Sequence, residues 1–111
     1  MSVLLMLLFF FADITGAWTA SFDTQIGIQS YTYTFKVDGN KLTGRLKSQF
    51  TDGEIQEGTI NGDDITFVEN LTFEGMPLRI VYKGKIVGDE IKLSRNVADI
   101  ATEEATAKRV K

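Results

Sequence analysis

Two charged residues occupy positions where the alternation of the strands calls for an apolar side chain. They are the first candidates for chemistry. Glu69 follows Phe67, and Arg95 follows Leu93, at the two-residue spacing that places side chains on one face of a β-strand. Tyr82 is predicted to share that face. An isolated charge buried in an apolar interior costs several kcal/mol, so it must be paired. These residues would form a polar floor for a ligand, unless a register shift or a bulge turns both charges to solvent.

Histidine and cysteine are absent from all 111 residues, which excludes most catalytic chemistry. A serine nucleophile would lack its usual histidine base, and a cysteine nucleophile is missing. Zinc lacks imidazole and thiolate ligands. Carboxylates alone can hydrolyse glycosides, but many acidic residues fall in or beside predicted turns, where they cap backbone groups: Asp38, Asp52, Asp63, Asp64, Asp89 and Glu90. We therefore predict a non-enzymatic protein without metal or cofactor. A carboxylate-dependent glycoside hydrolase is the weaker alternative.

The distribution of charge excludes a nucleic-acid partner. The net charge is −3, and Lys and Arg are scattered among Asp and Glu without a basic run. Nucleic-acid-binding domains instead concentrate positive charge on one face.

An apolar segment, residues 1–12, precedes the rest of the chain. The run from Ser2 to Ala12 is about half of the ~20 residues that span a membrane, so no stable membrane span is predicted. Its length favours the remnant of a signal peptide and a secreted or periplasmic protein. However, no Lys or Arg precedes it, and Phe10 occupies a cleavage-site position that favours small residues. The alternative is an apolar segment that packs on a partner. Residues 13–111 are predicted to form a single domain.

Two-residue alternation and regular turns predict strands almost throughout residues 13–111. The alternation is clearest over Gln29–Val37. Asn-Gly and Asp-Gly turns recur, and three glycine turns belong to an internal repeat: Val37-Gly39-Leu42, Ile60-Gly62-Ile65 and Ile86-Gly88-Ile91. We predict strands near 15–23, 28–37, 41–50, 53–60, 64–73, 77–87, 90–97 and 104–110, with a short helical turn within 97–104.

This pattern predicts an all-β fold, an antiparallel up-and-down meander of about eight strands closed into a small barrel. Closure is favoured because it removes exposed strand edges; a flattened two-sheet sandwich is the main alternative. The many inward aromatic residues, Phe50 among them, favour a mostly filled interior. The candidate ligand-binding residues on the inward face are Tyr31, Tyr33, Glu69, Tyr82 and Arg95.

The segment Gly16-Ala17-Trp18 resembles the Gly-x-Trp pattern of the calycins, the group of lipocalins, fatty-acid-binding proteins and avidins. In that group the tryptophan closes one end of the barrel and often packs beneath an arginine from the last strand. The resemblance implies that Trp18 and Arg109 form a structural pair that closes the barrel. Stacking of arginine on an aromatic ring contributes about 0.5–2 kcal/mol.

Longer segments resemble small secreted bacterial β-domains that accompany glycoside hydrolases and esterases. The similarity covers nearly all of 13–111 and is carried by turn and core residues in Asp13–Ala20, Phe22–Gly27, Phe35–Gly44, Tyr82–Ile91 and Ala107–Val110. It implies a secreted, non-catalytic accessory or binding domain whose ligand is a carbohydrate or another small molecule. The alternative is a structural or protein-interaction domain that uses the apolar segment 1–12.

Overall fold

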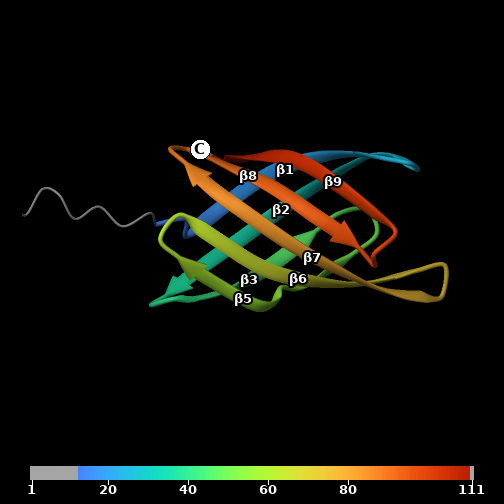
Figure 1. Cartoon of the computed structure of the whole chain (residues 1–111), viewed down its shortest axis with the longest axis horizontal. Helices are drawn as coiled ribbons and strands as arrows, with labels where there is room; N and C mark the ends of the chain where they lie inside the picture. Colours follow the sequence, from blue (N-terminus) through green and yellow to red (C-terminus); the bar gives the residue numbers. More distant parts are fainter. Residues whose placement is uncertain (1–12, 111) are drawn as a thin grey trace, which may run out of the picture.

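The chain folds into a closed antiparallel barrel (Figure 1). The computed structural model describes residues 13–110, so the predicted N-terminal segment 1–12 lies outside the described residues. The strands are β1 (Gly16–Thr24), β2 (Gly27–Asp38), β3 (Lys41–Lys47), β4 (Asp52–Glu54), β5 (Gln56–Asn61), β6 (Asp64–Phe73), β7 (Met76–Val87), β8 (Glu90–Val97) and β9 (Ala101–Arg109). Because β4 and β5 follow one another along the same side of β3, the nine segments make an eight-stranded wall.

The barrel closes because both ends of the sheet find partners. β2 pairs with β3 from Thr32 to Asp38, and β1 pairs with β9 at Trp18–Arg109 and Thr19–Lys108. From β5 to β9 each strand is antiparallel to the next. These pairings confirm the predicted meander and barrel rather than the two-sheet sandwich. None of the elements within residues 13–110 is a helix, so this part contains no helical segment suited to crossing a membrane.

The three repeated turns connect β2 to β3, β5 to β6 and β7 to β8. Their glycines, Gly39, Gly62 and Gly88, have φ values of 63°, 62° and 62°. Glycine adopts this left-handed conformation without the steric cost that other residues incur. The internal repeat is therefore one type of hairpin turn used three times.

The predicted helical turn within 97–104 is wrong. Ala98 and Asp99 have φ values of 51° and 62° and form a tight turn, and β9 begins at Ala101. The Asn96 side chain accepts a hydrogen bond from the Asp99 amide at 2.9 Å and fixes this turn. The predicted strand 53–60 is also divided, because β4 ends at Glu54 and β5 begins at Gln56. Within β5, Glu57 has a φ of 52° and the register with β6 shifts beside it.

Alternating side chains fill the half of the barrel nearest the start of β1. Trp18, Tyr33, Phe35 and Phe67 are almost fully buried there. The rings of Tyr33 and Phe35 stack with their centroids 5.6 Å apart, and Phe67 meets both edge to face. The prediction of a filled interior therefore holds for this half, whereas the other half is open.

Candidate ligand-binding site

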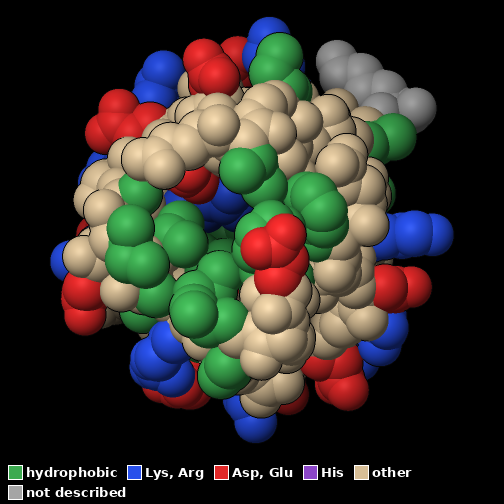
Figure 2. Space-filling model, turned by 90° about the vertical axis from the view of Figure 1, so that its right-hand side faces the viewer, with side chains coloured by type: hydrophobic (Ala, Val, Ile, Leu, Met, Phe, Trp, Pro, Cys, Tyr) green, Lys and Arg blue, Asp and Glu red, His purple; other side chains and the backbone are tan. Residues whose placement is uncertain are grey.

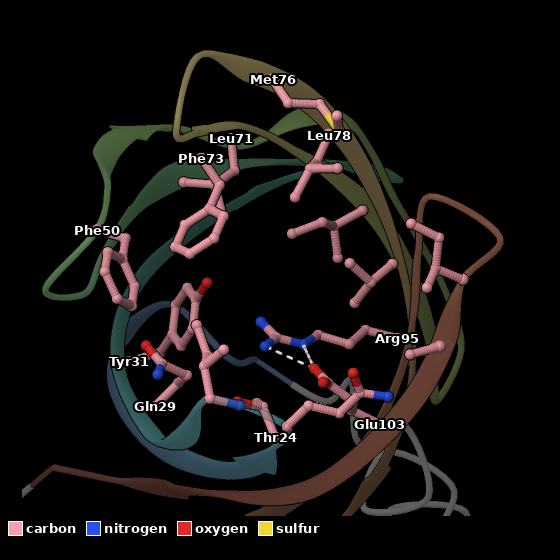
Figure 3. A pocket seen from close by; sticks show the side chains of 16 residues that line it. Thr24, Gln29, Tyr31, Phe50, Leu71, Phe73, Met76, Leu78, Arg95 and Glu103 are labelled. Carbon is pink, nitrogen blue, oxygen red and sulfur yellow. Dashed lines mark hydrogen bonds and ion pairs between the residues drawn. The ribbon is translucent and has the colours of Figure 1, made fainter.

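The open end of the barrel contains a cavity of about 300 Å³. It lies among the β1–β2 turn, the β6–β7 hairpin and the β8–β9 loop (Figure 3). Figure 2 looks into this end and shows hydrophobic side chains around a hollow with charged side chains inside. Most of the lining is apolar or aromatic, and the full set is Thr24, Gln25, Ile26, Gln29, Tyr31, Phe50, Leu71, Phe73, Met76, Leu78, Ile80, Arg95, Val97, Ile100, Ala101 and Glu103.

The rim of the cavity exposes large apolar side chains to solvent. Ile26 is 59% exposed, Met76 60% and Ile100 72%. Phe50, predicted to point inward from a long third strand, is instead 41% exposed, because β3 ends at Lys47. Its ring meets Phe73 edge to face at 5.4 Å between centroids. Exposed apolar side chains around a cavity are characteristic of a surface that binds an apolar partner.

Arg95 from β8 reaches the floor of the cavity and is paired with Glu103 from β9. The two residues lie opposite one another in the β8–β9 register. Arg95 donates from Nε to Glu103 Oε1 at 2.8 Å, and its Nη2 lies 2.8 Å from the same oxygen. Both side chains are largely removed from water, at 4% and 12% exposure. The pair is therefore a buried ion pair at the boundary between the cavity and the core.

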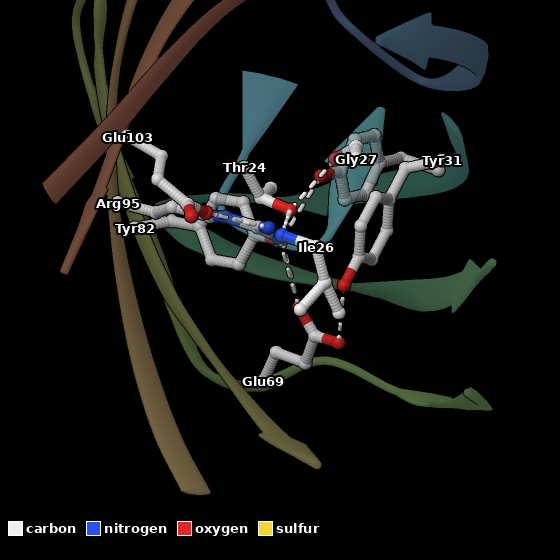
Figure 4. Close-up of polar contacts among 9 residues, drawn as sticks. Thr24, Ile26, Gly27, Tyr31, Glu69, Tyr82, Arg95 and Glu103 are labelled. Carbon is white, nitrogen blue, oxygen red and sulfur yellow. Dashed lines mark hydrogen bonds and ion pairs between the residues drawn. The ribbon is translucent and has the colours of Figure 1, made fainter. Parts of the chain in front are cut away.

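A hydrogen-bonded cluster lies directly beneath this floor (Figure 4). Glu69 accepts hydrogen bonds from the hydroxyls of Tyr31 at 2.9 Å and Tyr82 at 2.8 Å. The Tyr82 hydroxyl in turn accepts from Tyr33 at 3.0 Å and from Arg95 Nη1 at 2.9 Å. Tyr82 thus uses its one donor and both acceptor positions.

Burial controls the ionisation of this cluster. It raises the pKa of Glu69 above its usual value, although hydrogen bonds from Tyr82 and Tyr31 and the charge of Arg95 oppose the shift. Burial also raises the pKa values of Tyr33 and Tyr82 well above the ordinary tyrosine range. The tyrosines therefore remain neutral hydroxyls at physiological pH, and Arg95 remains charged.

Aromatic rings contact the faces of the Arg95 guanidinium, in addition to the hydrogen bonds at its edges. Its central carbon lies 4.0 Å from the ring centre of Phe22 and 5.0 Å from that of Tyr31. Cation–π contacts of this kind fix the orientation of the planar group. The guanidinium at the floor of the cavity is consequently preorganised.

Gln29 on β2 supplies a further polar group to the cavity wall, close to Tyr31 (Figure 3). Gln29 is only 4% exposed to solvent. Its Oε1 is buried and has no hydrogen-bond partner within residues 13–110. Buried carbonyl oxygens nearly always have a partner, so Gln29 holds an unused acceptor beside the cavity.

The structure brings together all five predicted ligand-binding residues but divides them between two layers. Tyr31 and Arg95 line the cavity, whereas Glu69, Tyr82 and Tyr33 lie beneath it. Of the five, direct contact with a ligand in the cavity is therefore open only to Tyr31 and Arg95. Glu69 and Arg95 are buried, so neither a register shift nor a bulge turns them to solvent.

Sequence reasoning missed Glu103 and Gln29 as site residues. Glu103 stands in Ala101–Arg109, a segment whose alternation is weak because threonine, alanine and charged residues dominate it. The sequence pattern predicts a strand only from residue 104, whereas β9 begins at Ala101. Gln29 precedes Tyr31 by two positions, so the alternation of β2 itself placed it on the inner face. That spacing was the available signal.

The opposite end of the barrel is closed by Trp18 and Arg109. The guanidinium carbon of Arg109 lies 4.5 Å from the Trp18 ring centre. Arg109 also donates to the carbonyl oxygens of Thr15 at 3.3 Å and Asp13 at 3.0 Å. The Trp18 indole donates to the carbonyl of Ile14 at 2.9 Å. This arrangement corresponds to the one that the calycin resemblance implies, and it lies away from the cavity.

Comparisons with known proteins identify the fold. The sequence matches no protein-family model and no curated protein. Two solved structures are similar, each over 88% of this chain and 96% of the other with a TM-score of 0.56: a mutant of the fluorescent protein UnaG, 12% identical, and the REP1-NXSQ fatty acid transporter, 16% identical. At these identities the similarity shows the barrel fold alone.

Proposed function

We propose that the protein is a non-catalytic binding barrel for a small, largely apolar molecule that enters at the open end. The observation that carries this proposal is the cavity of about 300 Å³, with apolar walls and a buried ion pair at its floor. Ligand pockets typically have this character and begin at about this volume. One neighbouring structure is that of a fatty acid transporter, which supports binding of an apolar ligand.

The lining favours an apolar molecule over a carbohydrate, the other ligand class that the sequence leaves open. A sugar needs many hydrogen-bonding partners, whereas most of the residues around this cavity offer carbon surface. Catalysis is disfavoured because Glu103 is paired with Arg95 and Glu69 is bound by two tyrosines. Secretion or a periplasmic location, which rests on the apolar segment 1–12, is part of the proposal.

Binding of the neutral fluorescent probe N-phenylnaphthylamine tests the proposal. We expect probe fluorescence to rise on binding. Leu78→Phe, which narrows the cavity, should weaken the affinity by about tenfold, or ~1.4 kcal/mol. Val87→Phe is the matched control, because Val87 is 53% exposed and does not line the cavity. Absence of probe binding, or equal affinities for the two variants, would overturn the proposal.

A further inference from the structure

The cation at the floor of the cavity is already paired with acidic side chains of the protein. Arg95 directs Nε and Nη2 to Glu103 Oε1, and Nη1 to the Tyr82 hydroxyl. Its Nη1 also lies 3.8 Å from Glu69 Oε1. An anionic ligand would have to compete with carboxylates that are preorganised around this guanidinium.

The charge balance at the floor leaves no positive excess for a ligand anion. Two carboxylates, Glu69 and Glu103, surround the single guanidinium of Arg95. The group is neutral when Glu69 is protonated and carries a charge of −1 when both acids are ionised. Arg95 and Glu103 are the only charged side chains among the described residues that line the cavity. A ligand carboxylate would bring uncompensated negative charge into a site largely removed from water, which is costly.

Two side-chain oxygens near this floor retain acceptor capacity. Gln29 Oε1 is buried without a partner among the described residues. Both contacts of Arg95 with Glu103 use Oε1, so the Glu103 Oε2 atom makes neither of them. A carboxylate oxygen only accepts hydrogen bonds when it is ionised. A ligand N–H or O–H group would complement these oxygens.

We propose that the ligand's polar end is a neutral or cationic hydrogen-bond donor, an alcohol or amine, bound by Gln29 and Glu103, and that an apolar body occupies the walls. This inference rests on the proposed binding function and specifies its ligand class. This ligand class differs from that of a cavity that binds a free carboxylate, because Arg95 is paired with the protein's own acidic residues.

Three ligands with the same apolar chain and different ends test the inference. Decylamine, decanol and decanoate are each titrated against the bound N-phenylnaphthylamine probe at neutral pH, below the concentrations at which they form micelles. We expect the amine and the alcohol to displace the probe at concentrations at least about tenfold lower than decanoate. A tenfold ratio corresponds to ~1.4 kcal/mol.

Variants of one acidic residue and its neighbour identify the group responsible. Glu103→Gln should reduce the preference for decylamine over decanol several-fold, because it removes the negative charge. Glu104→Gln is the matched control, since Glu104 lies next along β9 and is exposed, and it should leave the preference unchanged. Gln29→Leu should weaken decanol binding several-fold without altering the ion pair. Circular dichroism confirms that each variant is folded.

The outcomes separate failure of this inference from failure of the proposed function. If the probe binds but decanoate competes as well as the amine and alcohol, or none of the three competes, the donor-headed ligand is overturned while the binding cavity stands. If Glu104→Gln alters the preference as much as Glu103→Gln, the preference arises from the overall charge and the inference is again overturned. If the probe itself fails to bind, the proposed function fails.

Discussion

Replacing Arg95 with methionine should destabilise the protein far more than the same replacement at Arg79. Both arginines form close ion pairs, at 2.8 Å with Glu103 and 2.7 Å with Glu57. They differ in burial: the Arg95 side chain is 4% exposed, whereas that of Arg79 is 55% exposed. The comparison therefore varies the environment of the pair while the chemistry of the substitution stays the same.

The expected loss of stability depends on the buried groups that lose their partner when Arg95 is replaced. Arg95→Met keeps an apolar chain of similar shape but leaves two carboxylates without their cation and the Tyr82 hydroxyl without one donor. Breaking a buried pair by removing one partner costs about 3–5 kcal/mol. Arg79→Met leaves Glu57 in water, so its effect should be small.

Urea unfolding followed by fluorescence of Trp18, the single tryptophan, measures both effects. With an m-value of about 1.5 kcal/mol per M, within the range for small domains, Arg95→Met should lower the midpoint by about 2–3 M. Adding Glu69→Gln to Arg95→Met should recover part of this loss, because it removes one of the two unpaired charges. Equal midpoint shifts for the Arg95 and Arg79 variants would refute the argument that burial determines the cost.

Three further predictions concern packing, closure and pH. Gly44→Ala should cost about 1–3 kcal/mol, because its Cβ would lie 1.9 Å from a backbone oxygen; Gly53→Ala, whose Cβ meets nothing within 4 Å, is the thermal-unfolding control and should change Tm little. Arg109→Met should lose about 0.5–2 kcal/mol of stacking on Trp18. It should lower Tm by several degrees and shift the tryptophan emission. An unchanged emission spectrum and Tm would contradict the role of Arg109 in closing the barrel. Because the pKa of Glu69 is raised in the native state from its usual 4.5, this residue adds stability as pH falls through the raised pKa toward 4.5. The Tm of Glu69→Gln should lack that gain, and parallel Tm curves for variant and wild type between pH 7 and 5 would refute the assignment.

The barrel was predictable because its signals are local. The alternation of β2 and the glycine turns at Gly39, Gly62 and Gly88 each require only a short stretch of chain. Once several such hairpins occur in succession, closure follows from the cost of exposed strand edges. The same local spacing placed Glu69 and Arg95 on the inner face, and both are buried.

The cavity was less predictable because it depends on contacts distant in the sequence. Alternation assigns a residue to the inner face, but it does not give the height of that residue along the barrel. Tyr31 and Tyr33 are equivalent in the pattern of β2, yet only Tyr31 reaches the cavity. The pairing of Arg95 with Glu103 depends on the β8–β9 register, and the weak alternation of β9 concealed it.

The polar residues beneath the cavity and those that line it have different roles in stability and in ligand binding. Glu69, Tyr82 and Tyr33 hold Arg95 from within the core, so substitutions there should alter folding and binding together. Gln29 Oε1 has no partner within the described residues, so removing it sacrifices no hydrogen bond of that part of the fold. A preorganised site gains affinity because its groups are already ordered before the ligand arrives. In this barrel Glu69, Tyr82 and Tyr33 supply the preorganisation. Selectivity for the polar end of the proposed ligand should depend on Gln29 and Glu103, which line the cavity.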